Sequence, residues 1–151
     1  MTAIRGVLLD LSGVLYVGSG AVPGAPEALA RLRGAGLPLR FITNTTRSTR
    51  KAIGEKLRRL GFEIEDDEIF TAPSAVRAYL AEHGLRPQLL IHPGLEPEFD
   101  EVDQHDPNAV VLGDAGEAFD YVHLNRAFRL LVDGAPLIAM GDNRYFAEET
   151  A

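Results

Sequence analysis

The chain has 151 residues, of which 46% are hydrophobic, enough for one ordinary domain, or one domain and the beginning of another, with a buried core. It has no cysteine, which excludes a disulfide framework, a thiolate metal site and a cysteine nucleophile. No segment approaches the roughly 20 apolar residues of a membrane span, and an acidic residue, Asp10, arrives before a signal-peptide core could form. We therefore expect a cytoplasmic globular protein with no membrane partner.

The net charge of −7 is unevenly distributed along the chain. Residues 1–60 carry 10 Lys and Arg against 3 Asp and Glu, and residues 61–151 carry 5 against 19. The basic first part suits a phosphorylated ligand, whereas the acidic remainder argues against a nucleic-acid partner, which needs a continuous basic stripe. Both parts are equally consistent with ordinary solvated surfaces.

The first part alternates strands and helices. Val7 to Leu9 is an apolar run closed by Asp10, typical of a parallel strand buried on both faces. Apolar residues then recur at helical spacing from Ala25 until Gly34, and a second strand is predicted at Leu39–Ile42. A second helix follows Ser48 and ends near Gly61. The order of elements predicts an α/β unit with parallel pairing and right-handed crossovers.

The second part alternates again, after an acidic connector at Glu63–Glu68 and a boundary near Phe70. The elements expected there are a helix over 71–83, strands at Gln88–Ile91 and Ala109–Leu112 separated by an irregular acidic stretch, a helix striped by Tyr121, Leu124, Phe128 and Leu131, and a strand at Leu137–Met140. The apolar stripe of the last helix is expected to pack into a core, with a groove for a partner as the alternative if the stripe stays uncovered.

Polar residues follow both strands of the first part. In an open α/β sheet, ligands bind beyond the carboxyl ends of the strands, where Asp10-Leu11-Ser12-Gly13 and Thr43-Asn44 fall. A carboxylate beside backbone amides freed by a glycine turn can attack phosphorus, while the amides hold the phosphoryl oxygens. The alternative is that Asp10 caps a turn and that Thr43 and Asn44 satisfy a loop.

A resemblance to a known family favours the chemical interpretation. Asp10–Tyr16, Val22–Ala25 and Phe41–Thr46 occur in the order of the first two motifs of the haloacid dehalogenase (HAD) superfamily, and more narrowly resemble its capped NagD-like branch. Further matches lie at Leu60–Ile64, Gly84–Pro87 and Asp106–Val111. The resemblance implies an α/β fold with an incomplete Rossmann-like HAD core and an inserted α/β cap. Residues 1–70 would be the N-terminal part of the core, and residues 71–151 an incomplete cap.

The resemblance also implies roles for individual residues. Asp10 would be the nucleophile, forming an aspartyl-phosphate, and a ligand of Mg²⁺; Ser12 would bind the ion through its backbone carbonyl. Asp10, Leu11, Ser12, Thr43 and Asn44 would contact the substrate. Mg²⁺ prefers hard oxygen ligands, usually one or two carboxylates with substrate phosphate. Without such a cation, Asp10 and a phosphate would repel each other.

Ser12 is a departure from the family pattern. Most HAD phosphatases carry a second aspartate there, which protonates the leaving group and then activates water, and a serine hydroxyl cannot exchange a proton in this way at neutral pH. Ser12 is still predicted to be a catalytic residue, but we expect substrates with simple alkoxide leaving groups to be hydrolysed slowly. The subgroup that this chain resembles also has serine there, and it acts on pyrophosphate and on phosphorylated Lys and His, whose leaving groups need less help.

The later family motifs are a second departure. They supply a lysine and an acidic Gly-Asp segment after the cap, but Lys51 and Lys56 are the only lysines of this chain and both precede the cap. Gly113-Asp114 and Gly141-Asp142 mimic the acidic motif at positions where the resemblance places cap strands. We therefore expect a chain that ends inside the cap and is catalytically incomplete as it stands.

Two groups of side chains are weaker candidates. The four histidines show no metal-ligand spacing, and His92 is expected in a solvated loop. A group of basic residues is expected either to guide an anion toward Thr43 or to form a solvated helix face: Arg47, Arg50, Lys51, Arg58 and Arg59.

The leading hypothesis is a Mg²⁺-dependent HAD phosphatase acting on a small phosphorylated substrate, with a homodimer through the cap as its assembly. The alternative is a non-catalytic binding or regulatory module on the same scaffold. A receiver-type phosphoacceptor domain is disfavoured because its paired acids and later lysine are absent.

Overall fold

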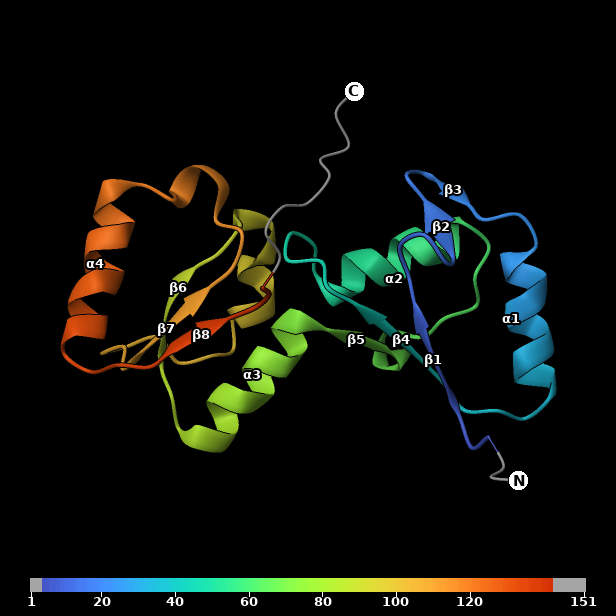
Figure 1. Ribbon diagram of the computed structural model, residues 1–151, viewed down its shortest axis with the longest axis horizontal. Coiled ribbons are helices and arrows are strands. Elements are labelled where there is room, and N and C mark those ends of the chain that lie inside the picture. The colour runs from blue at the N-terminus through green and yellow to red at the C-terminus, as the bar shows by residue number, and fades with distance from the viewer. Residues whose placement is uncertain (1–3, 143–151) are drawn as a thin grey trace. The chain divides into compact units, whose positions relative to one another are not determined.

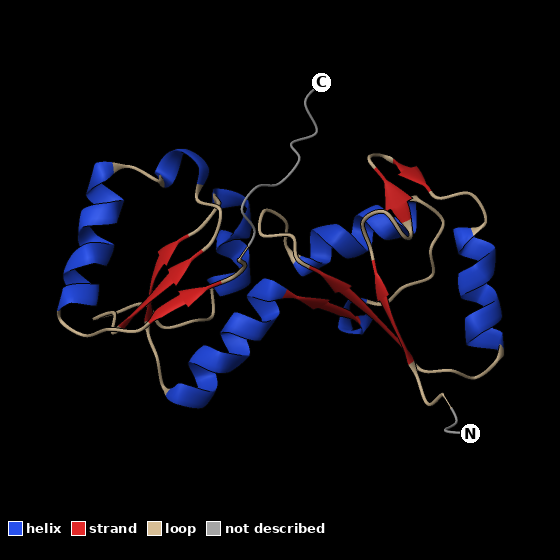
Figure 2. Ribbon diagram, viewed as in Figure 1, coloured by secondary structure: helices blue, strands red, loops and turns tan. Residues whose placement is uncertain are grey.

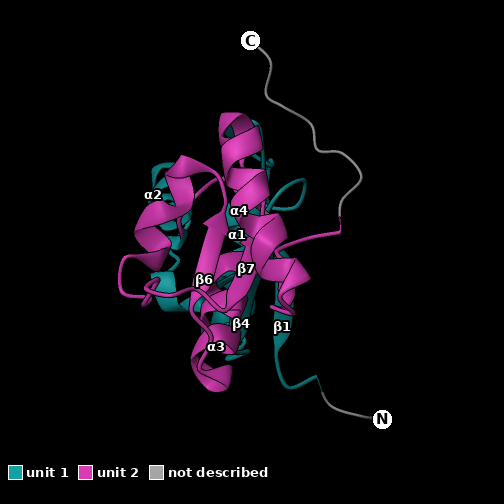
Figure 3. Cartoon of the chain, turned by 90° about the vertical axis from the view of Figure 1, so that its left-hand side faces the viewer, with its two compact units in different colours: residues 1–43, 50–71, 147–151 teal, residues 44–49, 72–146 magenta. Residues whose placement is uncertain are grey.

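A computed structural model describes residues 4–142 of the chain. Their contacts divide them into two compact units, the first formed by residues 4–43 and 50–71 and the second by residues 44–49 and 72–142 (Figure 3). Each unit is built around its own parallel sheet. The interpretation of these units as part of a core and part of a cap stays a prediction. Within the described residues, no helix is long and apolar enough to cross a membrane.

The first unit is a parallel sheet with two connecting helices (Figures 1 and 2). The strands lie in the order β1 (Val7–Asp10), β4 (Leu39–Thr43) and β5 (Ile69–Thr71). Helix α1 (Ala25–Gly34) connects β1 to β4, and α2 (Arg50–Arg59) lies between β4 and β5. A two-residue hairpin, β2 (Tyr16–Val17) with β3 (Gly20–Ala21), precedes α1. The alternation confirms the α/β prediction.

The core of the first unit lies on one face of its sheet. Apolar side chains of the strands and of both helices share this core: Leu29, Leu39, Phe41, Ile53, Leu57 and Ile69. On the other face Leu8 is 69% exposed and Phe70 is 55% exposed. The prediction that β1 is buried on both faces is therefore wrong for the described residues. The strand order β1, β4, β5 runs in one direction along the sheet, and successive crossovers of the same hand then place both helices on the same side.

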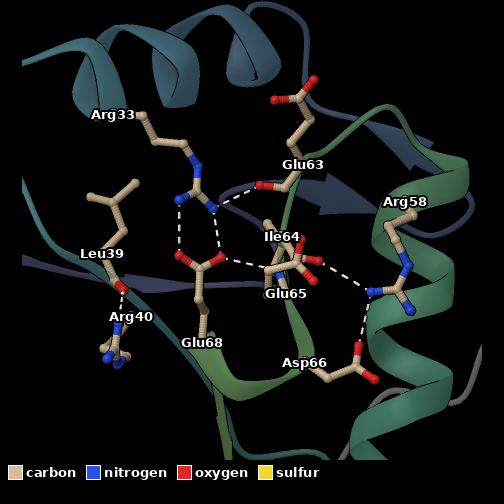
Figure 4. A network of polar contacts seen from close by, with 9 residues as sticks. All are labelled: Arg33, Leu39, Arg40, Arg58, Glu63, Ile64, Glu65, Asp66 and Glu68. Atoms are coloured by element: carbon tan, nitrogen blue, oxygen red, sulfur yellow. Dashed lines mark hydrogen bonds and ion pairs between the residues drawn. The ribbon is translucent and has the colours of Figure 1, made fainter. Parts of the chain in front are cut away.

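A polar network ties the two helices to the connector before β5 (Figure 4). Arg33 of α1 binds both carboxylate oxygens of Glu68, at 2.8 and 2.6 Å, and also donates to the carbonyl oxygen of Glu63 at 2.7 Å. Arg58 of α2 donates to Asp66 at 2.8 Å. Asp66 and Glu68 belong to the 3₁₀ helix η1 (Asp66–Glu68). The hydrogen bond from Arg33 holds the pKa of the Glu68 carboxyl below its ordinary value.

Replacing Glu68 with glutamine should lower the free energy of unfolding by about 1 kcal/mol at pH 7, because it removes a two-pronged charged contact that is only partly exposed. A carboxyl whose folded-state pKa is depressed stabilises the fold above its unfolded pKa of about 4.3, and this stability is lost as the pH falls through the folded pKa. Urea denaturation should therefore show a difference at pH 7 that shrinks on acidification. Glu63→Gln is the matched control, since Arg33 contacts only the backbone there.

The second unit has helices on both faces of its sheet. Its strands lie in the order β6 (Pro87–Leu90), β7 (Ala109–Leu112) and β8 (Leu137–Ala139), all parallel. The other elements are α3 (Ala72–His83), the 3₁₀ helices η2 (Pro93–Phe99) and η3 (Gly116–Ala118), and α4 (Tyr121–Val132). Ala109 and Val111 of β7 share a core with α3 and η2, and the alternate residues Val110 and Leu112 face α4. The central strand therefore packs against helices on both faces, as is typical of parallel strands.

Helix α4 packs more loosely than its sequence pattern predicts. Ala127 is its one buried residue, whereas Tyr121 is 81% exposed and Phe128 is 62% exposed. An apolar groove of about 320 Å³ lies between the helix and the sheet, lined by Leu90, Val110, Leu112, Phe119, Leu124, Ala127, Phe128, Leu131 and Leu137. The prediction of core packing is wrong for Tyr121, Leu124 and Phe128, which are exposed, because the helix is buried only at the small residue Ala127.

Candidate active site

The candidate site begins with two neighbouring strand ends in the first unit. Asp10 is the last residue of β1 and pairs in register with Ile42 of β4, so Thr43, the last residue of β4, lies one position beyond it. Side chains alternate along a strand, so Asp10 stands on the face of Leu8 and Thr43 on the face of Phe41. A ligand that contacts both groups must therefore sit over the edge of the sheet, beyond the strand ends.

A tight loop fixes the orientation of Asp10. Leu11 is fully buried, and its carbonyl oxygen accepts hydrogen bonds from the backbone N–H groups of Leu15 at 2.9 Å and Tyr16 at 3.3 Å. Gly13 adopts a φ of 81°, in the left-handed region, and its N–H donates to the carbonyl oxygen of Tyr16 at 2.8 Å. Glycine is needed there for its conformation, since a Cβ would meet nothing within 4 Å.

The carboxylate of Asp10 is exposed at the mouth of this loop. One of its oxygens, Oδ1, accepts a hydrogen bond from the backbone N–H of Leu11 at 2.8 Å, which fixes the direction of the group. The side chain of Leu11 is inaccessible, so a contact between Leu11 and a substrate is confined to its backbone. The arrangement leaves the Asp10 side chain exposed to solvent with one of its oxygens held by the backbone.

Ser12 is exposed in the same loop. Its bridge to Tyr16 uses the backbone groups of its neighbours, Leu11 and Gly13, and within the described residues the carbonyl oxygen of Ser12 accepts no hydrogen bond. An accessible carboxylate and an uncommitted carbonyl oxygen are ligands that suit Mg²⁺, which keeps several waters in protein sites. Residues 4–142 contain no cluster of three or more His, Cys, Asp or Glu side chains that could hold a metal.

The predicted pair Thr43 and Asn44 is divided between the two units. Thr43 is half-buried at the end of β4 and belongs to the first unit, whereas Asn44 is exposed and belongs by its contacts to the second. Although the two residues are neighbours in the chain, Thr43 is held by contacts within the first unit and Asn44 by contacts within the second.

An ion pair that the sequence does not predict lies in the second unit. Arg47 forms an ion pair with Asp114, which follows β7. This pairing holds the pKa of the Asp114 carboxyl below its ordinary value. His92, expected in a solvated loop, accepts a hydrogen bond through Nδ1 from the N–H of Gly94 at 3.0 Å and caps η2. No local pattern could reveal the ion pair, because its partners are 67 residues apart.

Comparisons with known proteins identify the family of the chain. The model of the family described as haloacid dehalogenase-like hydrolase matches residues 7–105. Haloacid dehalogenase-like hydrolase domain-containing protein 2 from Homo sapiens is 51% identical over 144 residues, covering 95% of this chain and 56% of the relative. Phospholysine phosphohistidine inorganic pyrophosphate phosphatase from Rattus norvegicus is 45% identical over 154 residues, covering 98% and 57%.

Among solved structures, NagD from E. coli K-12 matches with a TM-score of 0.85 at 23% identity, covering 97% of this chain and 60% of that structure. The likeness confirms an α/β fold with parallel sheets that matches NagD-like structures over part of their length. The chain spans a little more than half of the length of these relatives, 56% and 57%. By the family model and its relatives, the chain belongs to the haloacid dehalogenase-like hydrolases.

Proposed function

We propose that Asp10 is the nucleophile of a Mg²⁺-dependent phosphohydrolase that acts through an aspartyl-phosphate. The observation that supports this most is the exposed carboxylate at the end of β1, held by the N–H of Leu11 at 2.8 Å, in a chain of the HAD-like hydrolase family. Membership of the family supports a hydrolase activity, and the exposed position of Asp10 at the end of β1 supports its role as the attacking group. The proposed substrates are small phosphorylated compounds, pyrophosphate, or phosphorylated Lys and His.

The chemistry proceeds in two displacements. An oxygen of Asp10 forms a bond to phosphorus while the bond from phosphorus to the leaving group breaks, and water then attacks the acyl phosphate to release phosphate and regenerate the carboxylate. Thr43, through its hydroxyl, and Asn44, through its amide, orient phosphoryl oxygens at the strand end. The reaction therefore needs no thiol or histidine nucleophile.

Mg²⁺ would be held by Asp10 and the carbonyl oxygen of Ser12, and when bound it offsets the repulsion between carboxylate and phosphate. Ser12 has no acidic proton to give to a departing alkoxide at neutral pH. Leaving groups that are stable as anions, or that bring their own proton, are therefore favoured. Pyrophosphate and phosphoramidates meet this requirement, and one relative is named for phospholysine, phosphohistidine and pyrophosphate.

The proposal is tested by phosphate release from the protein as its gene encodes it. With Mg²⁺ present, pyrophosphate and phosphohistidine should be hydrolysed at least about tenfold faster than a simple alkyl phosphate, which lacks general-acid assistance worth roughly 10²-fold or more. Removal of the ion with EDTA should abolish release, and added Mg²⁺ should restore it.

Turnover that survives EDTA would contradict the role of the ion. Binding of phosphate compounds without any release would instead favour a binding or regulatory module. Pairing of two copies through the second unit is part of the same proposal, and sedimentation of the protein tests it independently of activity.

A further inference from the structure

The short segment between β4 and α2 is the starting point of this inference. Residues 44–49 leave the end of β4 and lead into α2, and both of these elements belong to the first unit. The contacts of the segment nevertheless belong to the second unit. The chain therefore crosses to the second unit after Thr43 and returns before Arg50.

An ion pair holds the segment there. Nε of Arg47 donates to Oδ2 of Asp114, whose other oxygen accepts a hydrogen bond from the N–H of Gly116 at 3.2 Å. The side chain of Asp114 is only 18% exposed. Asp114 is thus oriented by its own loop and presents one oxygen to Arg47. A partly buried charged contact of this kind is stronger than one on an open surface.

The backbone of the segment is also packed closely against the first turn of η2. A Cβ built on Gly94 would lie 2.9 Å from the carbonyl oxygen of Arg47 and 3.1 Å from Nδ1 of His92. Only a glycine leaves room for this approach, since the obstructing atom is backbone and cannot rotate away. Two independent contacts, one from the side chain and one from the backbone of Arg47, therefore fasten the segment to the second unit.

We propose that Arg47 is a positioning residue, which through Asp114 and the close approach at Gly94 fastens residues 44–49, and with them Asn44, to the second unit. The two candidate phosphate-binding residues, Thr43 and Asn44, are then adjacent in the chain but held by different units. The substrate contact of Asn44 rests on the proposed function, whereas the fastening itself does not.

Hydrogen exchange on the protein as its gene encodes it, without substrate, tests the fastening. Asp114→Asn should speed exchange of the amides of residues 44–49 by about five- to tenfold, the change expected when a charged contact is lost. Gly94→Ala should speed exchange in the same amides by a different route, because its methyl group displaces the carbonyl of Arg47. The charge-swapped pair Arg47→Asp with Asp114→Arg should recover part of the protection lost in each single variant.

The matched control is Asp66→Asn, which breaks the Arg58 ion pair in the first unit and should leave residues 44–49 unaffected. Unchanged exchange at 44–49 in both Asp114→Asn and Gly94→Ala would overturn the inference. With pyrophosphate as substrate, Arg47→Gln should raise KM more than it lowers kcat, as displacement of Asn44 requires. Faster exchange in a protein that releases no phosphate would uphold the fastening and refute the proposed function, so the two failures are distinguishable.

Discussion

Replacing Asp10 with asparagine should abolish phosphate release, with a loss on the order of 10³-fold or more, because the amide cannot form the acyl phosphate and the loss of a nucleophile removes the whole covalent route. Asparagine keeps an oxygen that accepts the Leu11 N–H, which Asp10 binds at 2.8 Å, so the loop and the fold should persist. The measurement is phosphate release from pyrophosphate with Mg²⁺ by the protein as its gene encodes it and by its Asp10→Asn variant, together with thermal unfolding of both.

The control for charge alone is Asp67→Asn, which neutralises an exposed carboxylate of η1 in the same unit and should change the rate less than about twofold, because exposed charges distant from a site are largely screened. Normal turnover by Asp10→Asn with an unchanged melting temperature would refute the assignment of the nucleophile. Trapped phosphate on the wild-type protein, absent from the variant, would add direct support for the intermediate.

Replacing Phe41 with alanine should have the largest effect on stability, a loss of about 3–5 kcal/mol, the range for removing a buried aromatic side chain. Phe41 is fully buried in β4, the central strand of the first sheet, and packs with Leu39, Leu57 and Ile69. Urea denaturation should show a lower midpoint with an unchanged slope, since the amount of surface exposed on unfolding hardly changes.

Phe70→Ala is the matched control on the adjacent strand. Its side chain is 55% exposed on the other face of the sheet, so the loss should be about 1 kcal/mol or less. An equal loss in both variants would mean that Phe70 is covered in the folded protein, and it would contradict the one-sided packing described for residues 4–142.

Local pattern was sufficient for the longer elements. The helical spacing that begins at Ala25 predicts α1, and the apolar run at 109–112 predicts β7 with its bounds. The apolar runs also predict the strand ends near Asp10 and Thr43, because the apolar residues of each run stop where the chain leaves the sheet. The chemical role of these residues came from the resemblance to a family, and it stays a prediction.

Features that depend on distant residues were beyond local pattern. β5 has three residues, too few to show an alternation, and the boundary predicted near Phe70 falls in the middle of this strand. The exposure of Leu8 and Tyr121 depends on which elements cover a sheet or helix, which periodicity alone does not specify. The division of Thr43 from Asn44 depends likewise on an ion pair formed far along the chain.

The crossing of residues 44–49 into the second unit also orders the assembly of the protein during synthesis. β4, α2 and β5 leave the ribosome well before Asp114, which follows Arg47 by 67 residues. The strands of the first sheet can therefore pair before Arg47 can bind Asp114. The entropic cost of closing the chain between Arg47 and Asp114 grows only slowly with the length of that chain. Until the turn after β7 has been translated, the segment is an open loop, and exposed loops are where proteases cut.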